Sequence, residues 1–176
     1  MKVYTGVGAR ATPKEILKVM TRIAEQRSLT HIVRTGGAAG ADEQFEVAEN
    51  KVLYLPWNKF RGKEGIGKYT KEQEAFADKI LQKVFPYTYN LKHVTRLMFR
   101  RNVFQVVGLC DRMKDVEPSE QLVCWTPDGA ENAMAYNIET TGGTGIAILI
   151  ADYFDVPVYN LQRPETLQEV LEYLKP

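Results

Sequence analysis

The stretch Thr35-Gly36-Gly37-Ala38-Ala39-Gly40-Ala41-Asp42 separates a short apolar run at residues 31–34 from a segment of helical character at residues 42–50. Because glycine has no Cβ, the backbone can turn sharply here and approach another group closely. The pattern therefore predicts a strand that turns tightly into a helix. The first N–H groups of such a helix have no partner within it and lie at the positive end of its dipole, so the turn is also a candidate anion site.

Two more glycine-rich turns occur at comparable places in the chain. Gly6-Val7-Gly8-Ala9-Arg10 follows an expected strand at residues 2–5 and precedes an expected helix at residues 12–27. Thr141-Gly142-Gly143-Thr144-Gly145 precedes an apolar helix at residues 146–154. Turns that follow parallel strands open at the same edge of a sheet. We therefore expect the three turns to meet at one crevice that holds a phosphate or a nucleotide.

The rest of the chain alternates in the same way. Further strands are expected at residues 51–55, 121–125 and 156–160, and further helices at residues 70–84, 91–109 and 165–174. Residues 58–67 are polar and glycine-rich, as in a loop or lid. The strands are short and apolar without strict alternation, which is typical of a parallel sheet covered on both faces. We predict an α/β fold, a Rossmann-like three-layer sandwich with a mainly parallel central sheet, in one nucleotide-binding domain spanning residues 1–176.

Composition narrows the function classes. Among the 176 residues, 23 Lys and Arg nearly balance 22 Asp and Glu, so no overall basic field favours non-specific binding to nucleic acid. Cys110 and Cys124 have no metal-ligand spacing and are expected to be buried, as in a reducing compartment. The N-terminus lacks an apolar signal segment, and the apolar run at residues 146–151 is too short to span a bilayer. We expect a cytoplasmic protein that uses no metal or cofactor and does not bind membranes.

The first two turns bring different side chains to the expected crevice. The first contributes Gly8 and Arg10, whose guanidinium can clamp a phosphate. The second carries three glycines, at Gly36, Gly37 and Gly40. They are followed by Asp42, which either caps the next helix or accepts a ribose hydroxyl.

The third turn is the strongest candidate for an anion site. Its glycines Gly142, Gly143 and Gly145 expose backbone donors, and Thr144 adds a hydroxyl group. The first turn of the following helix contains no acidic residue that would compete with an anion. These features favour phosphate binding over a purely structural turn.

Several well-defined catalytic and nucleotide motifs do not occur in the sequence. The glycine spacing does not match GxGxxG or GxxxxGK[ST], which disfavours an NAD-dependent oxidoreductase and a P-loop NTPase. A GxSxG nucleophile motif is also missing. His31 falls at a strand and His93 at a basic helix, so a structural or solvent-facing role is favoured for both.

The helix expected at residues 91–109 carries a basic stripe. Lys92, Arg96 and Arg100 recur every four residues, and they form either a solvated face or, at the border of the crevice, a phosphate-binding surface. Arg101 falls on the apolar side of the helix, where an unpaired cation is costly. It therefore requires an anionic partner, which is either an internal carboxylate or a ligand.

Taken in order, the segments YTGVGAR, RTGGAAGADEQFEVA, YLPW, RRNVFQVVG, LVCWTPDG and TGGTGIAILIA resemble the SLOG superfamily, which includes DNA-processing protein A and the LOG nucleotide hydrolases. The resemblance covers nearly the whole chain and is greatest to short stand-alone members that are often found in phage genomes. It implies a Rossmann-like fold that binds nucleotide-derived ligands or nucleic acid at the glycine turns. By position, Arg101 and Asn102 resemble the Arg-Asn pair of the DNA-processing branch.

The sequence departs from the hydrolase branch of this superfamily at two positions. LOG hydrolases carry a pattern like GGxGTxxE, whereas this chain has Ile146 in place of the threonine and Leu149 in place of the catalytic glutamate. A leucine cannot assist cleavage of a glycosidic bond. A carboxylate for such a reaction would have to come from elsewhere, and Glu139, Glu43 and Asp128 are the candidates.

Three functions remain as hypotheses. The leading one is binding of a nucleotide, a nucleotide-derived signal or nucleic-acid phosphates at the glycine turns, with Trp57 or Trp125 stacking on a base. The alternatives are an N-glycosidic hydrolase of nucleoside monophosphates and a DNA-processing protein that binds single-stranded DNA through Arg96 or Arg100. Self-association as a homo-oligomer through the aromatic region around residues 87–99 is a further expectation.

Overall fold

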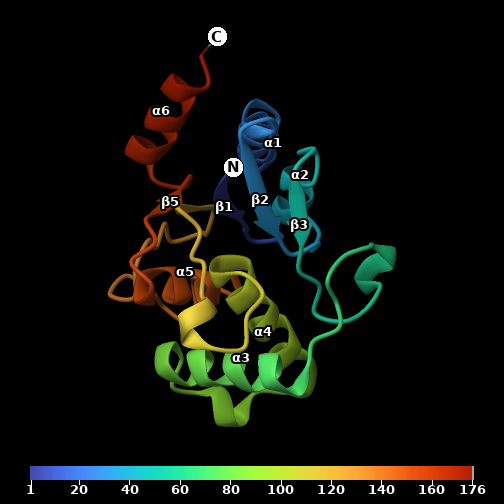
Figure 1. Cartoon of the computed structure of the whole chain (residues 1–176). Helices are drawn as coiled ribbons and strands as arrows, with labels where there is room; N and C mark the ends of the chain where they lie inside the picture. Colours follow the sequence, from blue (N-terminus) through green and yellow to red (C-terminus); the bar gives the residue numbers. More distant parts are fainter. Residues whose placement is uncertain (176) are drawn as a thin grey trace.

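A computed structural model describes residues 1–175 and shows a five-stranded sheet flanked by helices (Figure 1). The strands are β1 (Lys2–Gly6), β2 (His31–Thr35), β3 (Lys51–Leu53), β4 (Gln121–Cys124) and β5 (Val158–Asn160). All neighbouring strands pair in parallel, in the order β3-β2-β1-β4-β5. The predicted α/β fold with a Rossmann-like parallel sheet is therefore confirmed.

The strand order reverses at the centre of the sheet. The chain builds outward from β1 to β3, crosses back over the sheet, and then continues on the other side of β1 with β4 and β5. Tyr4 of β1 is in register with Gln121 of β4, and Lys2 of β1 with His31 of β2. In such sheets a ligand crevice forms at the carboxyl ends of the strands beside the point of reversal.

The helices are placed on both faces of the sheet. They are α1 (Lys14–Arg27), α2 (Ala41–Phe45), α3 (Lys71–Val84), α4 (His93–Val107), α5 (Thr144–Tyr153) and α6 (Pro164–Tyr173), with 3-10 turns η1 (Phe60–Gly62), η2 (Thr88–Asn90) and η3 (Met113–Asp115). Apolar side chains of α1, α2 and α6 share one core with Tyr4, Val33 and Val123 of the sheet. Those of α4 and α5 fill the other core, in which α5 is apolar on all sides and buried from Gly145 to Ala151.

Helix α3 adds a partial extra layer. It packs against the outer side of α4 and α5 through Phe76, Ala77, Ile80 and Leu81 and lies beyond α4 as seen from the sheet (Figure 1). Thr70 caps this helix by accepting a hydrogen bond from the Gln73 N–H group. Within residues 1–175, no helix combines the length and apolar character needed to cross a membrane.

Several expected elements are shorter in the structure. The helix expected at residues 42–50 ends at Phe45, because the chain must then turn to deliver Asn50 to the sheet, where its carbonyl accepts from Val33. The helix expected at residues 91–109 covers His93–Val107 and ends where Gly108 adopts a positive φ of 79°. The strands expected at residues 51–55 and 156–160 shorten to Lys51–Leu53 and Val158–Asn160.

Candidate functional site

The three glycine turns meet at one cleft, at the carboxyl edge of the sheet. The cleft has a volume of about 630 Å³, a size that suits a small-molecule ligand. Seven of the predicted ligand-binding residues line it: Gly8, Arg10, Asp42, Arg101, Asn102, Gly143 and Thr144. The other predicted glycines, Gly36, Gly37, Gly40, Gly142 and Gly145, are not part of the lining and shape the turns behind it.

The first turn continues β1 across the sheet edge and then bends into the cleft. Val7 donates its N–H to the Val123 carbonyl at 3.1 Å, so the turn begins in register with β4. A Cβ on Gly8 would lie 2.5 Å from the Cβ of Ala41, which explains why glycine is needed where this turn passes α2. Arg10, two residues later, is exposed at the wall of the cleft.

The second turn is held from within by an ion pair. Arg101 of α4 is 8% exposed, and its Nη1 lies 3.6 Å from Oδ2 of Asp42 and donates to the Gly36 carbonyl at 2.8 Å. The same Asp42 oxygen accepts from the Ala38 N–H at 3.2 Å. A Cβ at Gly36 would lie 2.5 Å from Arg101 Nη1, so only glycine permits this approach. The anionic partner that Arg101 requires is therefore an internal carboxylate.

Burial governs the electrostatics of this pair. It raises the pKa of Asp42, and the Arg101 charge and the Ala38 N–H oppose that shift. It also lowers the pKa of Arg101, against the effect of the Asp42 carboxylate. Because Asp42 is only 2% exposed and already paired, its carboxylate acts as a brace for the second turn in this structure.

The third turn presents the most open backbone. Gly142 adopts a positive φ of 69°, Gly143 is the N-cap of α5, and Cβ atoms built on either residue would meet nothing within 4 Å. Within residues 1–175, the N–H groups of Gly143 and Thr144 donate no hydrogen bond. The Asn102 side chain orients the turn by donating to the Gly143 carbonyl at 3.3 Å. The start of α5 therefore offers free N–H donors next to buried Arg101 and Asn102.

One wall of the cleft was not identified from the sequence. Phe60 and Arg61 of the loop after β3 and Met98 and Phe99 of α4 line it. Arg61 has a left-handed backbone (φ 52°) and donates to Glu43 Oε1 at 2.8 Å, which holds the loop against α2. The polar composition of residues 58–67 indicated a loop or lid, but which of its side chains face the cleft depends on contacts with distant residues.

The three candidate catalytic carboxylates lie outside the cleft lining. Glu139 is exposed, and Glu43 is paired with Arg61 and accepts from the Gly40 N–H at 3.3 Å. Asp128 accepts from the hydroxyls of Thr126, Thr140 and Thr141. Partial burial raises the pKa of Asp128, but these hydroxyls and the Ala130 N–H outweigh it and hold the pKa below its ordinary value. Asp128 thus anchors the segment that leads into the third turn.

The basic stripe of α4 does not border the cleft. Arg100 donates to both carboxylate oxygens of Asp78 at 2.8 and 2.6 Å, and Arg96 donates to the Thr88 carbonyl at 2.8 Å. These arginines therefore join α4 to α3 and η2, and they do not line the glycine cleft, as the phosphate-binding alternative required. The reason is that α3 packs on this side of α4, which the periodicity of one helix cannot reveal.

Neither tryptophan is part of the cleft lining. Trp57 is 38% exposed and packs edge-on against Phe60 with ring centroids 4.9 Å apart, while Trp125 packs on the core shared by α1 and α6. Phe60 and Phe99 supply the aromatic surface of the cleft instead. Of the aromatic region named for self-association, Tyr87 and Tyr89 are exposed.

Comparison with known proteins finds solved structures that share this fold. Neither a protein-family model nor a curated protein sequence matches the chain significantly. DNA processing protein A from Helicobacter pylori, whose structure shows a single-stranded DNA binding mode, matches with a TM-score of 0.55, at 14% identity over 98% of this chain and 72% of that chain. DNA processing protein A (DprA) from Streptococcus pneumoniae matches with a TM-score of 0.52, at 18% identity over 98% of this chain and 55% of that chain. The chain thus shares the Rossmann-like fold of these proteins.

Proposed function

We propose that the cleft binds the phosphate group of a nucleotide at the start of α5. The free N–H groups of Gly143 and Thr144 carry this proposal, because they are unpaired donors at the positive end of α5, a helix of 10 residues. Arg10 lines the same cleft, and within residues 1–175 no carboxylate forms an ion pair with it. A phosphate held there would accept from the backbone and be neutralised by arginine.

The apolar part of the cleft lining suits a base or another flat apolar group. Phe60, Met98 and Phe99 form it, and Val94 beside them is 54% exposed. Apolar and aromatic side chains in the lining can bury the face of a nucleobase, while the N–H groups at the start of α5 hold the phosphate. The lining thus offers contacts for both chemical parts of a nucleotide.

Single-stranded DNA is a second candidate ligand. The fold is shared with DNA processing protein A, and the H. pylori protein binds single-stranded DNA. From the order of the sequence motifs, together with this shared fold, we propose membership of the SLOG superfamily; that the chain is of the short type found in phage genomes is proposed from the sequence resemblance alone. A phosphate site at α5 serves either ligand, since a nucleotide within a strand carries the same phosphate group.

The third hypothesis, cleavage of an N-glycosidic bond, finds less support. Leu149 occupies the position of the catalytic glutamate, and the one carboxylate in the lining, Asp42, is buried and paired with Arg101. The proposal is therefore binding without hydrolysis. Release of free base from a nucleoside monophosphate, abolished by Glu43→Gln or Asp128→Asn, would overturn that part of it.

Equilibrium titration separates the two ligands. The protein is titrated with the common nucleoside 5′-monophosphates, with the matching nucleosides, and with oligothymidylate at several salt concentrations. We expect the monophosphates to bind more tightly than the nucleosides, and Arg10→Gln to weaken that binding, with Lys14→Gln on exposed α1 as the control. Binding of oligothymidylate alone, with a steep salt dependence, would favour single-stranded DNA. Equal affinity for nucleosides and monophosphates would contradict a phosphate site.

A further inference from the structure

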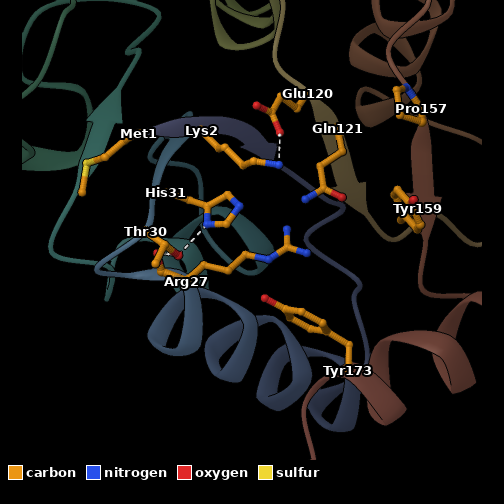
Figure 2. A pocket seen from close by; sticks show the side chains of 10 residues that line it. All are labelled: Met1, Lys2, Arg27, Thr30, His31, Glu120, Gln121, Pro157, Tyr159 and Tyr173. Atoms are coloured by element: carbon orange, nitrogen blue, oxygen red, sulfur yellow. Dashed lines mark hydrogen bonds and ion pairs between the residues drawn. The ribbon is translucent and has the colours of Figure 1, made fainter.

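A second cavity lies at the opposite edge of the sheet, where the strands begin. It has a volume of about 840 Å³, and Figure 2 shows the side chains that surround it. The sheet contributes the first residues of β1, β2 and β4 to this cavity, which are Lys2, His31 and Gln121. Arg27 enters from the end of α1 and Tyr173 from the end of α6. The cleft of the glycine turns lies beyond the other ends of these strands, so the two sites are separate.

Arg27 is the central group of this second cavity. Its guanidinium carbon lies 5.1 Å from the ring centroid of Tyr4 and 5.2 Å from that of Tyr173, so the cation is held between two aromatic faces. Figure 2 shows the guanidinium extended between Gln121 and Tyr173. Within residues 1–175, no carboxylate forms an ion pair with Arg27. A half-buried cation is thus fixed in position without a counter-charge.

The hydrogen bonds of Arg27 are also incomplete. When the Gln121 amide is oriented with its oxygen towards the guanidinium, that oxygen accepts from Nη1 and, at 3.1 Å, from Nη2. The buried Nε of Arg27 and the buried hydroxyl of Tyr4 have no partner among the described residues. Buried donors without acceptors are costly, and in native proteins they often mark the place of an absent ion or water. Two such donors occur here around one cation.

The other charges of the cavity do not compensate Arg27. Lys2 pairs with Glu120 at 3.4 Å, and Glu120 is the one acidic residue in the lining. The ring of His31 is engaged through Nδ1 with the Thr30 hydroxyl at 2.7 Å. Burial and the nearby Arg27 charge lower the pKa of His31, which disfavours the charged form of its imidazole. The cavity therefore has a net positive lining, and the only acceptor that the Arg27 fork meets among the described residues is the neutral Gln121 amide oxygen.

We propose that this second cavity binds a small oxyanion, a carboxylate or a phosphate, through the planar fork of Arg27. The guanidinium presents two parallel N–H donors that match the two oxygens of such a group. The oxyanion takes the place of the Gln121 amide oxygen, a neutral acceptor, and supplies the negative charge that the lining lacks. The rings of Tyr4 and Tyr173 keep the fork in a fixed orientation, so little side-chain freedom is lost on binding.

Nuclear magnetic resonance of the isotope-labelled full chain tests this site. Inorganic phosphate and succinate are titrated separately in chloride buffer, and the Arg27 Nε–H, the His31 ring and the Tyr173 amide are followed. Saturable shifts of these signals with at least one anion are expected, and the anion that binds more tightly identifies the source of the oxyanion group. The signals of Gly143 and Thr144 report binding at the glycine cleft independently, so failure of one site does not affect the test of the other.

Two variants of Arg27 and one matched control complete the experiment. Arg27→Gln should abolish the saturable shift of His31, and Arg27→Lys, which keeps the charge but loses the planar fork, should weaken binding at least tenfold. Arg22→Gln removes the neighbouring arginine of α1, which donates to the Leu174 carbonyl at 2.8 Å, and should leave anion binding unchanged. Absence of saturable shifts in the unmodified protein, or equal binding by Arg27→Lys, would show that Arg27 only braces α1 against β4 and α6.

Discussion

Arg101 of α4 and Asp42 of α2 form a buried ion pair, with Nη1 and Oδ2 3.6 Å apart. The pair connects a helix on one face of the sheet with the turn that enters a helix on the other face. Arg101 also reaches the Gly36 carbonyl, so one side chain fixes the second glycine turn at two points. The second glycine turn is therefore held in place by an ion pair and a hydrogen bond within the protein before any ligand binds.

This pair predicts an unequal response to neutralising two adjacent carboxylates of α2. Asp42→Asn is expected to lower the free energy of unfolding by about 3–5 kcal/mol, because it leaves the Arg101 charge buried without a partner. Glu43→Gln removes a partly exposed partner of Arg61 and should cost about 1 kcal/mol or less. Urea unfolding monitored by circular dichroism measures both. Similar losses in the two variants would mean that the buried pair contributes no more than a surface pair.

The close approach of Gly36 to Arg101 predicts a steric effect. Gly36→Ala places a Cβ 2.5 Å from Nη1 and must displace the guanidinium, with an expected loss of about 1–3 kcal/mol in stability. Gly143→Ala is the matched control, since its Cβ meets nothing within 4 Å and its φ of −64° suits alanine. Thermal unfolding of the two variants gives the comparison. A Gly36→Ala protein as stable as wild type would require that Arg101 has another favourable position.

The arginines of the basic stripe are predicted to matter for stability and not for ligand binding. Arg100→Ala removes the paired hydrogen bonds to Asp78 that fix α3 on α4, and should cost about 1–3 kcal/mol. The salt dependence of oligothymidylate binding should stay the same, because this side chain faces α3. Lys92→Ala, at an exposed position of the same stripe, controls for the loss of one positive charge. A weaker salt dependence of oligothymidylate binding in Arg100→Ala, but not in Lys92→Ala, would show that Arg100 contacts the DNA.

The lowered pKa of Asp128 predicts an acid-sensitive anchor for the third turn. The hydrogen bonds that the ionised Asp128 carboxylate accepts stabilise the fold fully above the ordinary aspartate pKa of about 4. This stabilisation is lost as the pH falls through the lower pKa that Asp128 has in the folded protein. Wild type should therefore be more stable than Asp128→Asn at neutral pH, and the difference should shrink below about pH 4. Thermal unfolding of both proteins across this pH range checks the sign. A difference that grows on acidification would contradict the contacts with Thr126, Thr140 and Thr141.

The sequence alone predicted the features that depend on residues close to one another along the chain. Glycine turns between apolar strands and helices are recognisable residue by residue, and parallel topology then brings the turns together at one edge. The sequence predicted that Arg101 needs either an internal carboxylate or an anionic ligand, because a cation on an apolar helix face is costly. The structure shows an internal carboxylate, that of Asp42.

Features that depend on distant contacts were not predictable in the same way. Arg96 and Arg100 point to α3, whose docking site on α4 is not encoded in the periodicity of either helix alone. Arg61 faces the cleft because its backbone is left-handed and Glu43 holds its side chain, and neither fact follows from a polar loop composition. The position of Arg27 between two aromatic rings likewise depends on where α6 places Tyr173.

The affinity of Gly143→Ala for the nucleoside 5′-monophosphate that binds best to wild type tests the central proposal most directly. An added methyl group at the start of α5 has free space in the protein, so the free energy of unfolding should stay within about 0.5 kcal/mol of wild type. The same methyl group would occupy space that a bound phosphate needs, and a loss of about tenfold or more in affinity is predicted, equivalent to about 1.4 kcal/mol. Unchanged affinity in a stably folded Gly143→Ala protein would contradict phosphate binding at this turn.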